Sequence, residues 1–357
     1  MKILYIALES ANWVVRLCNE MAKKGNDVVC LVQSSDDYEA GLEAEAHERL
    51  DVIRCSQEAI ADVKIFQRDI LPQISHIKFD VTFGSHVPVC PMVKALADAF
   101  KTPWGIMILD IPTDLMAKDK QRMSNWLYWF AHTQYADSMV FNTKVSRDEY
   151  HKYVNTYWPN VVTYGTHFIP EYKNSGIGVN GDYVLSICRL VDNKNCSLIP
   201  EALNLIQYPT KYIAVGRDGG ELQSIRDKCK EYGIEFEHRA NVTEKEKYEL
   251  IRDCGALIYP QKTEYIGGLS PFEGMYVGKP VIVPRLKVLT DLYEGYPYYF
   301  TNCDASSLAE QISFAFNRNW DMHTDHLREG SDYAEKYAGY EQMADGLLKV
   351  METMKNE

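Results

Sequence analysis

The sequence lacks long apolar runs, any C-x-x-C pair and any excess of positive charge. The N-terminal run ILYIAL holds six consecutive apolar residues, too few for the core of a signal peptide, and no later run approaches membrane-spanning length. Nine cysteines without a paired spacing indicate free thiols in a reducing compartment. We therefore expect a cytoplasmic protein, with peripheral contact at the inner face of a membrane left open.

Charge and length limit the possible partners of the protein and the number of its domains. The chain has 38 Lys and Arg against 50 Asp and Glu, a net charge of -12. Nucleic acid is therefore excluded as a partner, because neutralising its phosphates needs a basic face. A small anionic ligand remains compatible, since one pocket can be positive on an acidic protein. At 357 residues and 46% hydrophobic, the chain predicts two cores rather than one.

Strand and helix patterns alternate from the first residues. An apolar strand is predicted over residues 2–8, a helix over 12–24 and a strand over 27–33. This βαβ opening favours a parallel sheet with helices on both faces. Shorter strand-like runs follow at 81–83, 104–109 and 138–142. We predict a Rossmann-like domain over residues 1–170.

The alternation restarts after a stretch rich in Gly, Asn and Pro at residues 169–182, which is typical of a connection between domains. Further strands are predicted at 183–188, 212–215, 256–259 and 281–284. We predict a second Rossmann-like domain over residues 171–335. A C-terminal helix over 336–357 is expected to pack back on the N-terminal domain.

The segment YPQKTEYIGGLSPFEGMYVGKPVIVP, residues 259–284, reads strand, loop, helix, strand. Ser270 suits the N-cap of its helix, Pro271 the first helical position, and Glu273 the carboxylate of a capping box. Gly267 and Gly268 stand just before it. A glycine turn at a helix N-terminus favours an anion such as a diphosphate, because exposed N–H groups and the helix dipole point at it.

Two cations follow the strand that ends at Cys188. Arg189 and Lys194 stand five residues apart in SICRLVDNKN, at a strand end where open parallel sheets bind ligands. Together they could grip an anionic group, although exposed charges on a loop are more often only solvated. The run VGRDGG, residues 215–220, is a further strand followed by glycines, and Gly216 is its candidate ligand contact.

These three segments together resemble the donor domain of the retaining glycosyltransferases of family 4, which have the GT-B fold. The pattern G-R-L-x-x-x-K appears here as CRLVDNK, and the carboxylate motif E-x7-E appears in PQKTEYIGGLSPFEGMYVGKPVI. The resemblance covers about residues 180–300. It implies two α/β, Rossmann-like domains whose parallel sheets face each other across a cleft.

The resemblance also implies roles for single residues. Arg189 and Lys194 would bind the diphosphate of a nucleotide-sugar, and Glu264 would lie beside the donor sugar. The backbone from Gly267 through Leu269 to Ser270 would cradle sugar and phosphate. Glu273 would hold the ribose hydroxyls.

The sequence departs from the family pattern at several positions. Eight residues separate Glu264 from Glu273 where the family usually has seven, and Cys188 replaces a glycine. In the more divergent N-terminal half, the residues that would face the cleft are Ser10 in the loop ESANW, His86 after FDVTFGS, and Asp110 after WGIMIL.

The predicted function is a retaining glycosyltransferase. It would move a hexose from a UDP- or GDP-sugar to a glycan, a lipid-linked acceptor or another hydroxyl. We expect neither a cofactor nor a metal, because no D-x-D tripeptide occurs and the cluster HTDH at 323–326 has no third ligand nearby. Two alternatives stay open: a GT-B sugar-nucleotide epimerase and a non-catalytic nucleotide-sugar-binding protein. The oligomeric state is not predicted.

Overall fold

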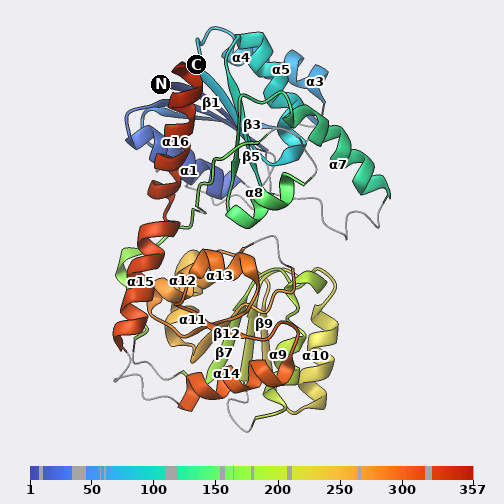
Figure 1. Ribbon diagram of the computed structural model, residues 1–357, viewed down its shortest axis with the longest axis vertical. Coiled ribbons are helices and arrows are strands. Elements are labelled where there is room, and N and C mark those ends of the chain that lie inside the picture. Colours follow the sequence, from blue (N-terminus) through green and yellow to red (C-terminus); the bar gives the residue numbers. More distant parts are fainter. Residues whose placement is uncertain are drawn as a thin grey trace. The chain divides into compact units, whose positions relative to one another are not determined.

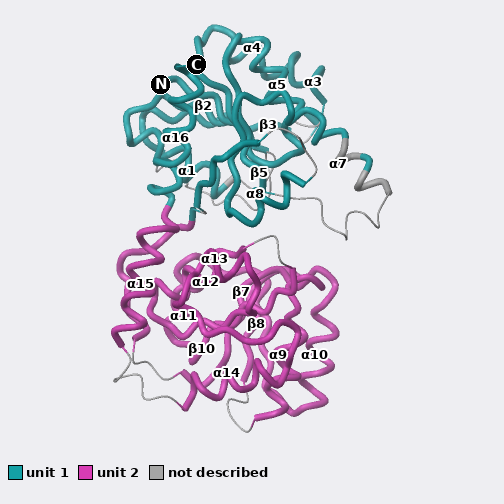
Figure 2. Tube along the Cα trace, in the orientation of Figure 1, with its two compact units in different colours: residues 1–165, 340–357 teal, residues 166–339 magenta. Residues whose placement is uncertain are grey.

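The structure is a computed structural model of the chain. It describes residues 1–7, 11–33, 46–56, 58–59, 62–109, 120–152, 157–163, 165–177, 181–206, 211–263, 267–317 and 324–356. The chain divides into two compact units: unit 1, residues 1–165 with 340–357, and unit 2, residues 166–339 (Figure 2). Each unit has a sheet of six parallel strands flanked by helices (Figure 1). The expected class of two Rossmann-like α/β domains is confirmed.

The sheet of unit 1 has the order β3-β2-β1-β4-β5-β6. Its central strand β1 is buried from Ile3 to Ala7, as expected of a parallel strand covered on both faces. The strands are β1 (Lys2–Ala7), β2 (Asp27–Gln33), β3 (Leu50–Cys55), β4 (Val81–Ser85), β5 (Trp104–Ile108) and β6 (Ser138–Phe141). The helices of this unit are α1 (Ala11–Lys23), α3 (Val63–Asp69), α4 (Leu71–Ile74), η1 (Val87–Val89), α5 (Cys90–Phe100), α7 (Lys120–Thr133), α8 (Lys144–Tyr150) and α16 (Tyr340–Asn356).

The C-terminal helix α16 belongs to the core of unit 1. Met343, Leu347, Met351 and Met354 recur at helical spacing and are buried against the apolar face of α1. Full burial of one such side chain is worth roughly 1.5–3 kcal/mol. Although it is far away in sequence, α16 is therefore an integral layer of the N-terminal fold.

The sheet of unit 2 has the order β12-β11-β10-β7-β8-β9. Its strands are β7 (Tyr183–Ile187), β8 (Lys211–Val215), β9 (Glu235–Arg239), β10 (Ala256–Ile258), β11 (Val281–Pro284) and β12 (Tyr298–Phe300). The helices around it are η2 (Pro170–Tyr172), η3 (Asp192–Lys194), α9 (Leu198–Leu203), α10 (Leu222–Glu231), α11 (Glu244–Asp253), α12 (Ser270–Val277), α13 (Lys287–Tyr293), α14 (Ala305–Asn317) and α15 (Thr324–Ala338).

The boundaries between the units lie at 165/166 and 339/340, where the sequence analysis placed them at 170/171 and 335/336. The difference arises because residues 166–170 already contact unit 2, where the hydroxyl of Tyr248 donates to the carbonyl of His167 at 2.6 Å. The residues that follow, 170–177, pack onto α12. The amide of Asn174 donates to the carbonyl of Tyr276 at 3.0 Å, and that of Gly176 donates to the carbonyl of Val277 at 2.8 Å. This part of the Gly- and Asn-rich stretch is therefore structured within unit 2 and is no loose connection.

Candidate functional site

The predicted ligand residues of unit 2 follow three neighbouring strands. β10, β7 and β8 lie side by side and run parallel, so their carboxyl ends share one edge of the sheet. Arg189 and Lys194 follow β7, Gly216 follows β8, and Gly267 to Glu273 follow β10. Such an edge is where open α/β sheets bind ligands. We call the segment 188–196, which carries both cations, the cation loop.

Arg189 is exposed at the start of the cation loop. Its neighbour Leu190 donates its amide to the carbonyl of Arg217 at 2.9 Å, which fixes the backbone of the loop against the end of β8. The guanidinium of Arg189 forms no hydrogen bond or ion pair with any residue that the structure describes. Its five N–H donors are therefore available to an anion.

Lys194 lies at the end of η3 and reaches the segment after β10. Its Nζ donates to the hydroxyl of Tyr259 and, at 2.9 Å, to Oε1 of Gln261. The amine also lies 4.8 Å from the centroid of the Tyr259 ring. Burial lowers the pKa of Lys194 below its usual value. An ammonium has three N–H donors, so one remains for a ligand.

Tyr259 connects the cation loop to the glycine turn. A Cβ on Gly268 would lie 2.4 Å from Cζ of Tyr259, so the ring packs directly against the turn and excludes any side chain there. The turn is also held from the other side, because the hydroxyl of Tyr293 donates to the carbonyl of Gly268 at 2.7 Å and accepts from its amide at 3.0 Å. Gly268 is thus fixed by packing as well as by hydrogen bonds.

The helix after the turn begins differently from the sequence prediction. Leu269 is the N-cap of α12, with Ser270 the first helical residue, and no side chain caps the helix. The predicted capping box is therefore wrong. Pro271 does lie in the first turn, where its missing N–H costs nothing. Without a capping side chain, the first amides of α12 are not covered by a serine or glutamate of their own helix.

Glu273 is buried and paired. Its Oε1 accepts from Nζ of Lys247 at 2.8 Å and from Oγ1 of Thr166 at 3.1 Å. Burial alone would lower the pKa of Lys247, but attraction from Glu273 and Glu244 outweighs it and raises the pKa. Lys247 is thus held in its protonated form beside Glu273.

Gly216 has a backbone that only glycine adopts easily. Its φ is +134°, and a Cβ would lie 2.0 Å from the carbonyl oxygen of Cys188. Its amide donates to the backbone carbonyl of Arg239 at 2.9 Å, and its carbonyl accepts from Nε2 of His238 at 2.8 Å. The end of β8 is therefore pressed against the residue that precedes Arg189.

Of the weaker candidates in unit 1, the structure describes one. His86 follows β4, has the unusual φ of 72°, and lies edge-on to Trp13 with ring centroids 6.4 Å apart. A non-glycine residue in this conformation is strained by about 1–3 kcal/mol, as is frequent at functional sites. Ser10, Asp110 and Glu264 lie outside the described residues.

Sequence reasoning missed the residues that hold the site together. Tyr259, Gln261 and Tyr293 position the cation loop and the glycine turn, and Lys247 holds Glu273. Tyr259 and Gln261 had a signal, because they flank Pro260 in the short segment that directly follows β10. Lys247 had none, since it comes from α11, about 26 residues upstream of Glu273.

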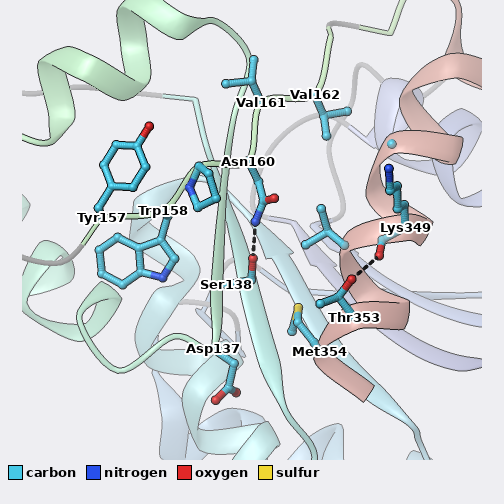
Figure 3. A pocket seen from close by; sticks show the side chains of 13 residues that line it. Asp137, Ser138, Tyr157, Trp158, Asn160, Val161, Val162, Lys349, Thr353 and Met354 are labelled. Atoms are coloured by element: carbon cyan, nitrogen blue, oxygen red, sulfur yellow. Dashed lines mark hydrogen bonds between the residues drawn. The ribbon is translucent and has the colours of Figure 1, made fainter. Parts of the chain in front are cut away.

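A separate pocket of about 570 Å³ lies in unit 1 beside β6 and α16 (Figure 3). It is lined by the Tyr157 and Trp158 rings, with the carboxylate of Asp137 and the amine of Lys349 as its charged groups. Asn160 Nδ2 donates to Ser138 Oγ at 2.9 Å across its wall. None of the predicted site residues lines it.

Among the residues that the structure describes, no group of three or more His, Cys, Asp and Glu side chains is arranged to hold a metal ion. No described helix is both long enough and apolar enough to span a membrane.

Sequence and structure comparisons give a consistent picture. Residues 170–335 match the family model described as glycosyl transferases group 1. The alpha-1,3/1,6-mannosyltransferase ALG2 of Dictyostelium discoideum is 40% identical over 81 residues, a match that covers 21% of this chain and 19% of that protein.

Similar solved structures cover almost the whole chain. HepE of Anabaena, crystallised with UDP and glucose, has a TM-score of 0.79 at 16% identity over 99% of this chain and 100% of its own. Sucrose-phosphate synthase of Thermosynechococcus elongatus has a TM-score of 0.77 at 14% identity over 98% of both chains. Such low identities show the fold alone. The chain therefore has the GT-B fold, and its residues 170–335 match the group 1 glycosyltransferase model.

Proposed function

We propose that this chain is a retaining glycosyltransferase that transfers a hexose from a nucleotide-diphosphate sugar to a hydroxyl of a glycan or lipid-linked acceptor. The group 1 family match over residues 170–335 supports the reaction class. The partial identity to a mannosyltransferase and the UDP and glucose in the HepE crystal support a nucleotide-sugar donor.

One observation carries the proposal: the cation loop and the glycine turn meet at a single side chain. Tyr259 accepts from the Lys194 amine, while its ring packs against Gly268 at the start of α12. A diphosphate beside this tyrosine would meet an ammonium and a helix N-terminus together. Arg189, unpaired among the described residues, would supply a planar fork to the same oxygens.

The chemistry of transfer fits this arrangement. Breaking a glycosyl–phosphate bond develops negative charge on the departing diphosphate and positive charge on the sugar. Arg189, Lys194 and the α12 N-terminus would stabilise the diphosphate, so we propose that no metal ion is needed. In the retaining reaction, the leaving phosphate would take the proton of the acceptor as it attacks from the same face. Glu264 would orient the sugar.

Glu273 is proposed to bind the ribose with its second oxygen. The hydrogen bonds that this carboxylate accepts from Lys247 and Thr166 both end on Oε1. The pairing fixes the carboxylate plane, and Oε2 would accept from a ribose hydroxyl.

The test is a binding screen of UDP, GDP, ADP and their sugars by calorimetry, followed by transfer assays with the donor that binds. Arg189→Ala should weaken nucleotide binding or slow transfer by roughly 10- to 100-fold, the value of one or two charge-assisted hydrogen bonds. Arg328→Ala is the matched control, because Arg328 is an exposed arginine on α15 of the same unit.

The outcomes separate the candidate functions. Donor turnover without any acceptor, giving an isomeric nucleotide-sugar, would indicate an epimerase. Binding without turnover across an acceptor panel would indicate a binding protein. Unchanged binding and turnover in Arg189→Ala would refute the proposed site.

A further inference from the structure

Two thiols stand at the ends of the cation loop. Cys188 directly precedes Arg189, and Cys196 follows Lys194 by two residues. Their Sγ atoms are 3.3 Å apart, and both are free thiols. Cys188 is half-buried, whereas Cys196 is fully buried behind it, with Ser186 Oγ 4.0 Å from its sulfur. Cys188 is thus the less buried residue of the pair, and its sulfur touches that of a fully buried cysteine.

The other cysteines lack one or both of these features. Cys18 and Cys30 of unit 1 also interact with each other, but both are fully buried. Cys303 is exposed, but its sulfur contacts amide groups: Asn195 Nδ2 at 3.9 Å and Asn302 Oδ1 at 3.5 Å. Cys303 therefore serves as the comparison for exposure without a thiol partner.

The surroundings of Cys188 favour its thiolate. A hydrogen bond from the thiol of Cys196 lowers the pKa of Cys188, and the cations of Lys194 and Arg189 lower it further, against the effect of burial. The pKa of Cys196 is raised by the same hydrogen bond and by burial. The thiolate is the nucleophilic form, so Cys188 is the attacking sulfur and Cys196 the partner that stays protonated.

We propose that Cys188 and Cys196 form a peroxide-sensitive dithiol that closes into a disulfide and loosens the hold of the cation loop on its ligand. The Cys188 thiolate attacks one oxygen of a hydroperoxide, the O–O bond breaks, and an alcohol or water leaves with the proton that the site supplies. The sulfenic acid on Cys188 is then attacked by Cys196, the S–S bond forms, and water leaves. Two thiols are oxidised and one hydroperoxide is reduced.

Closing the disulfide must move the loop. The bond length is about 2.05 Å, so the two sulfurs must approach by roughly 1.3 Å. Arg189 is bonded to Cys188, and Lys194 is held by Tyr259 and Gln261 on the other side. A displacement near 1 Å of a positioned group can cost about 100-fold in its effect. Oxidation should therefore weaken binding of a nucleotide diphosphate by about tenfold or more, a consequence that rests on the proposed function.

The first experiment needs no ligand. The reduced full-length chain is treated with a small excess of hydrogen peroxide, alkylated and digested with trypsin, which cuts after Arg189 and Lys194 and so separates the two cysteines. The expected product joins peptide 174–189 to peptide 195–211 and disappears on treatment with dithiothreitol. Cys303→Ser should give the same product.

A second variant tests the proposal even if the disulfide is too short-lived to be isolated. Cys196→Ser removes the resolving thiol, so dimedone should label the sulfenic acid on Cys188 in this variant and far less in the native chain. The proposal is overturned if peptides 174–189 and 195–211 stay unlinked and Cys188 in Cys196→Ser takes up dimedone no faster than Cys303.

The functional arm compares UDP and GDP binding before and after oxidation. Native chain and Cys303→Ser should lose about tenfold in affinity and recover it with dithiothreitol. A mapped disulfide with no nucleotide binding even in the reduced chain would refute the proposed function and leave the dithiol assigned. Intact nucleotide binding with no disulfide would refute this inference alone, and a disulfide without loss of affinity would refute its effect on the loop.

Discussion

Replacing Gly216 by alanine tests whether the close approach between β8 and the cation loop is required. The added Cβ would lie 2.0 Å from the carbonyl oxygen and 2.7 Å from the carbonyl carbon of Cys188. Both are backbone atoms, so the clash cannot be relieved by rotating a side chain. The residue that would be pushed away is bonded to Arg189, and the change should therefore reach the proposed ligand site.

The magnitude follows from two contributions. A non-glycine residue forced into a glycine backbone conformation costs about 1–3 kcal/mol, and overpacking in a closely packed region adds typically 1–3 kcal/mol. Together we expect about 3 kcal/mol. For a unit of this size, that corresponds to a fall in Tm of roughly 6–12 °C.

Gly220 provides a matched control. Its φ is also positive, at 109°, but a Cβ there would meet nothing within 4 Å. Gly220→Ala should therefore show only the conformational cost of about 1–3 kcal/mol. Calorimetric Tm values and nucleotide affinities are measured for both variants. If the two lose equal stability, or if Gly216→Ala binds nucleotide as well as Gly220→Ala does, the close approach is not what positions Arg189.

The remaining predictions concern charge. Glu273→Gln should lower the free energy of unfolding by about 3 kcal/mol, because Lys247 loses its buried partner. Glu235→Gln should lower it by under about 1 kcal/mol, since the pair of Glu235 with Lys211 is exposed. Urea unfolding of both variants measures the difference. Burial lowers the pKa of Lys194, so nucleotide affinity should fall as pH rises through that lowered pKa. Stability should rise with pH between the lowered pKa and 10.5, because the buried ammonium loses its proton there. Lys194→Arg should shift the loss of affinity to higher pH. Excess EDTA should leave transfer unchanged.

The sequence predicted the central strands and the edge strand β6 well, but it missed the edge strands β3, β9 and β12. β2 and β11 begin and end where the apolar runs predict, because parallel strands covered on both faces are almost continuously hydrophobic. β9 has the sequence EFEHR, with no residue buried, and β12 is only three residues long. Edge strands owe their form to a neighbouring strand, which a hydrophobic pattern does not report.

The candidate site was predictable in its position but not in its internal contacts. Arg189, Lys194, Gly216 and Gly268 follow adjacent strands, so the βα alternation was enough to place them at one edge. Glu273 was assigned to a capping box from its spacing to Ser270, but its carboxylate instead binds Lys247 of α11. A local motif competes with every long-range partner that the fold brings near, and an ammonium is a stronger partner than an amide.

The contacts of Tyr259 bear on the additional residue between Glu264 and Glu273, where the sequence departs from the family pattern. Tyr259 holds Lys194 on one side and Gly268 on the other, and neither contact passes through the segment between Gln261 and Gly267. An additional residue in that segment would therefore leave both contacts of Tyr259 in place, although the segment itself also meets the cation loop, where the amide of Lys262 donates to the carbonyl of Asn193 at 3.0 Å. On this reasoning the proposed diphosphate contacts would rest on the described residues, while the proposed contact of Glu264 with the donor sugar would depend on the segment with the additional residue. Shortening that segment by one residue should change which sugar is accepted more than which nucleotide binds.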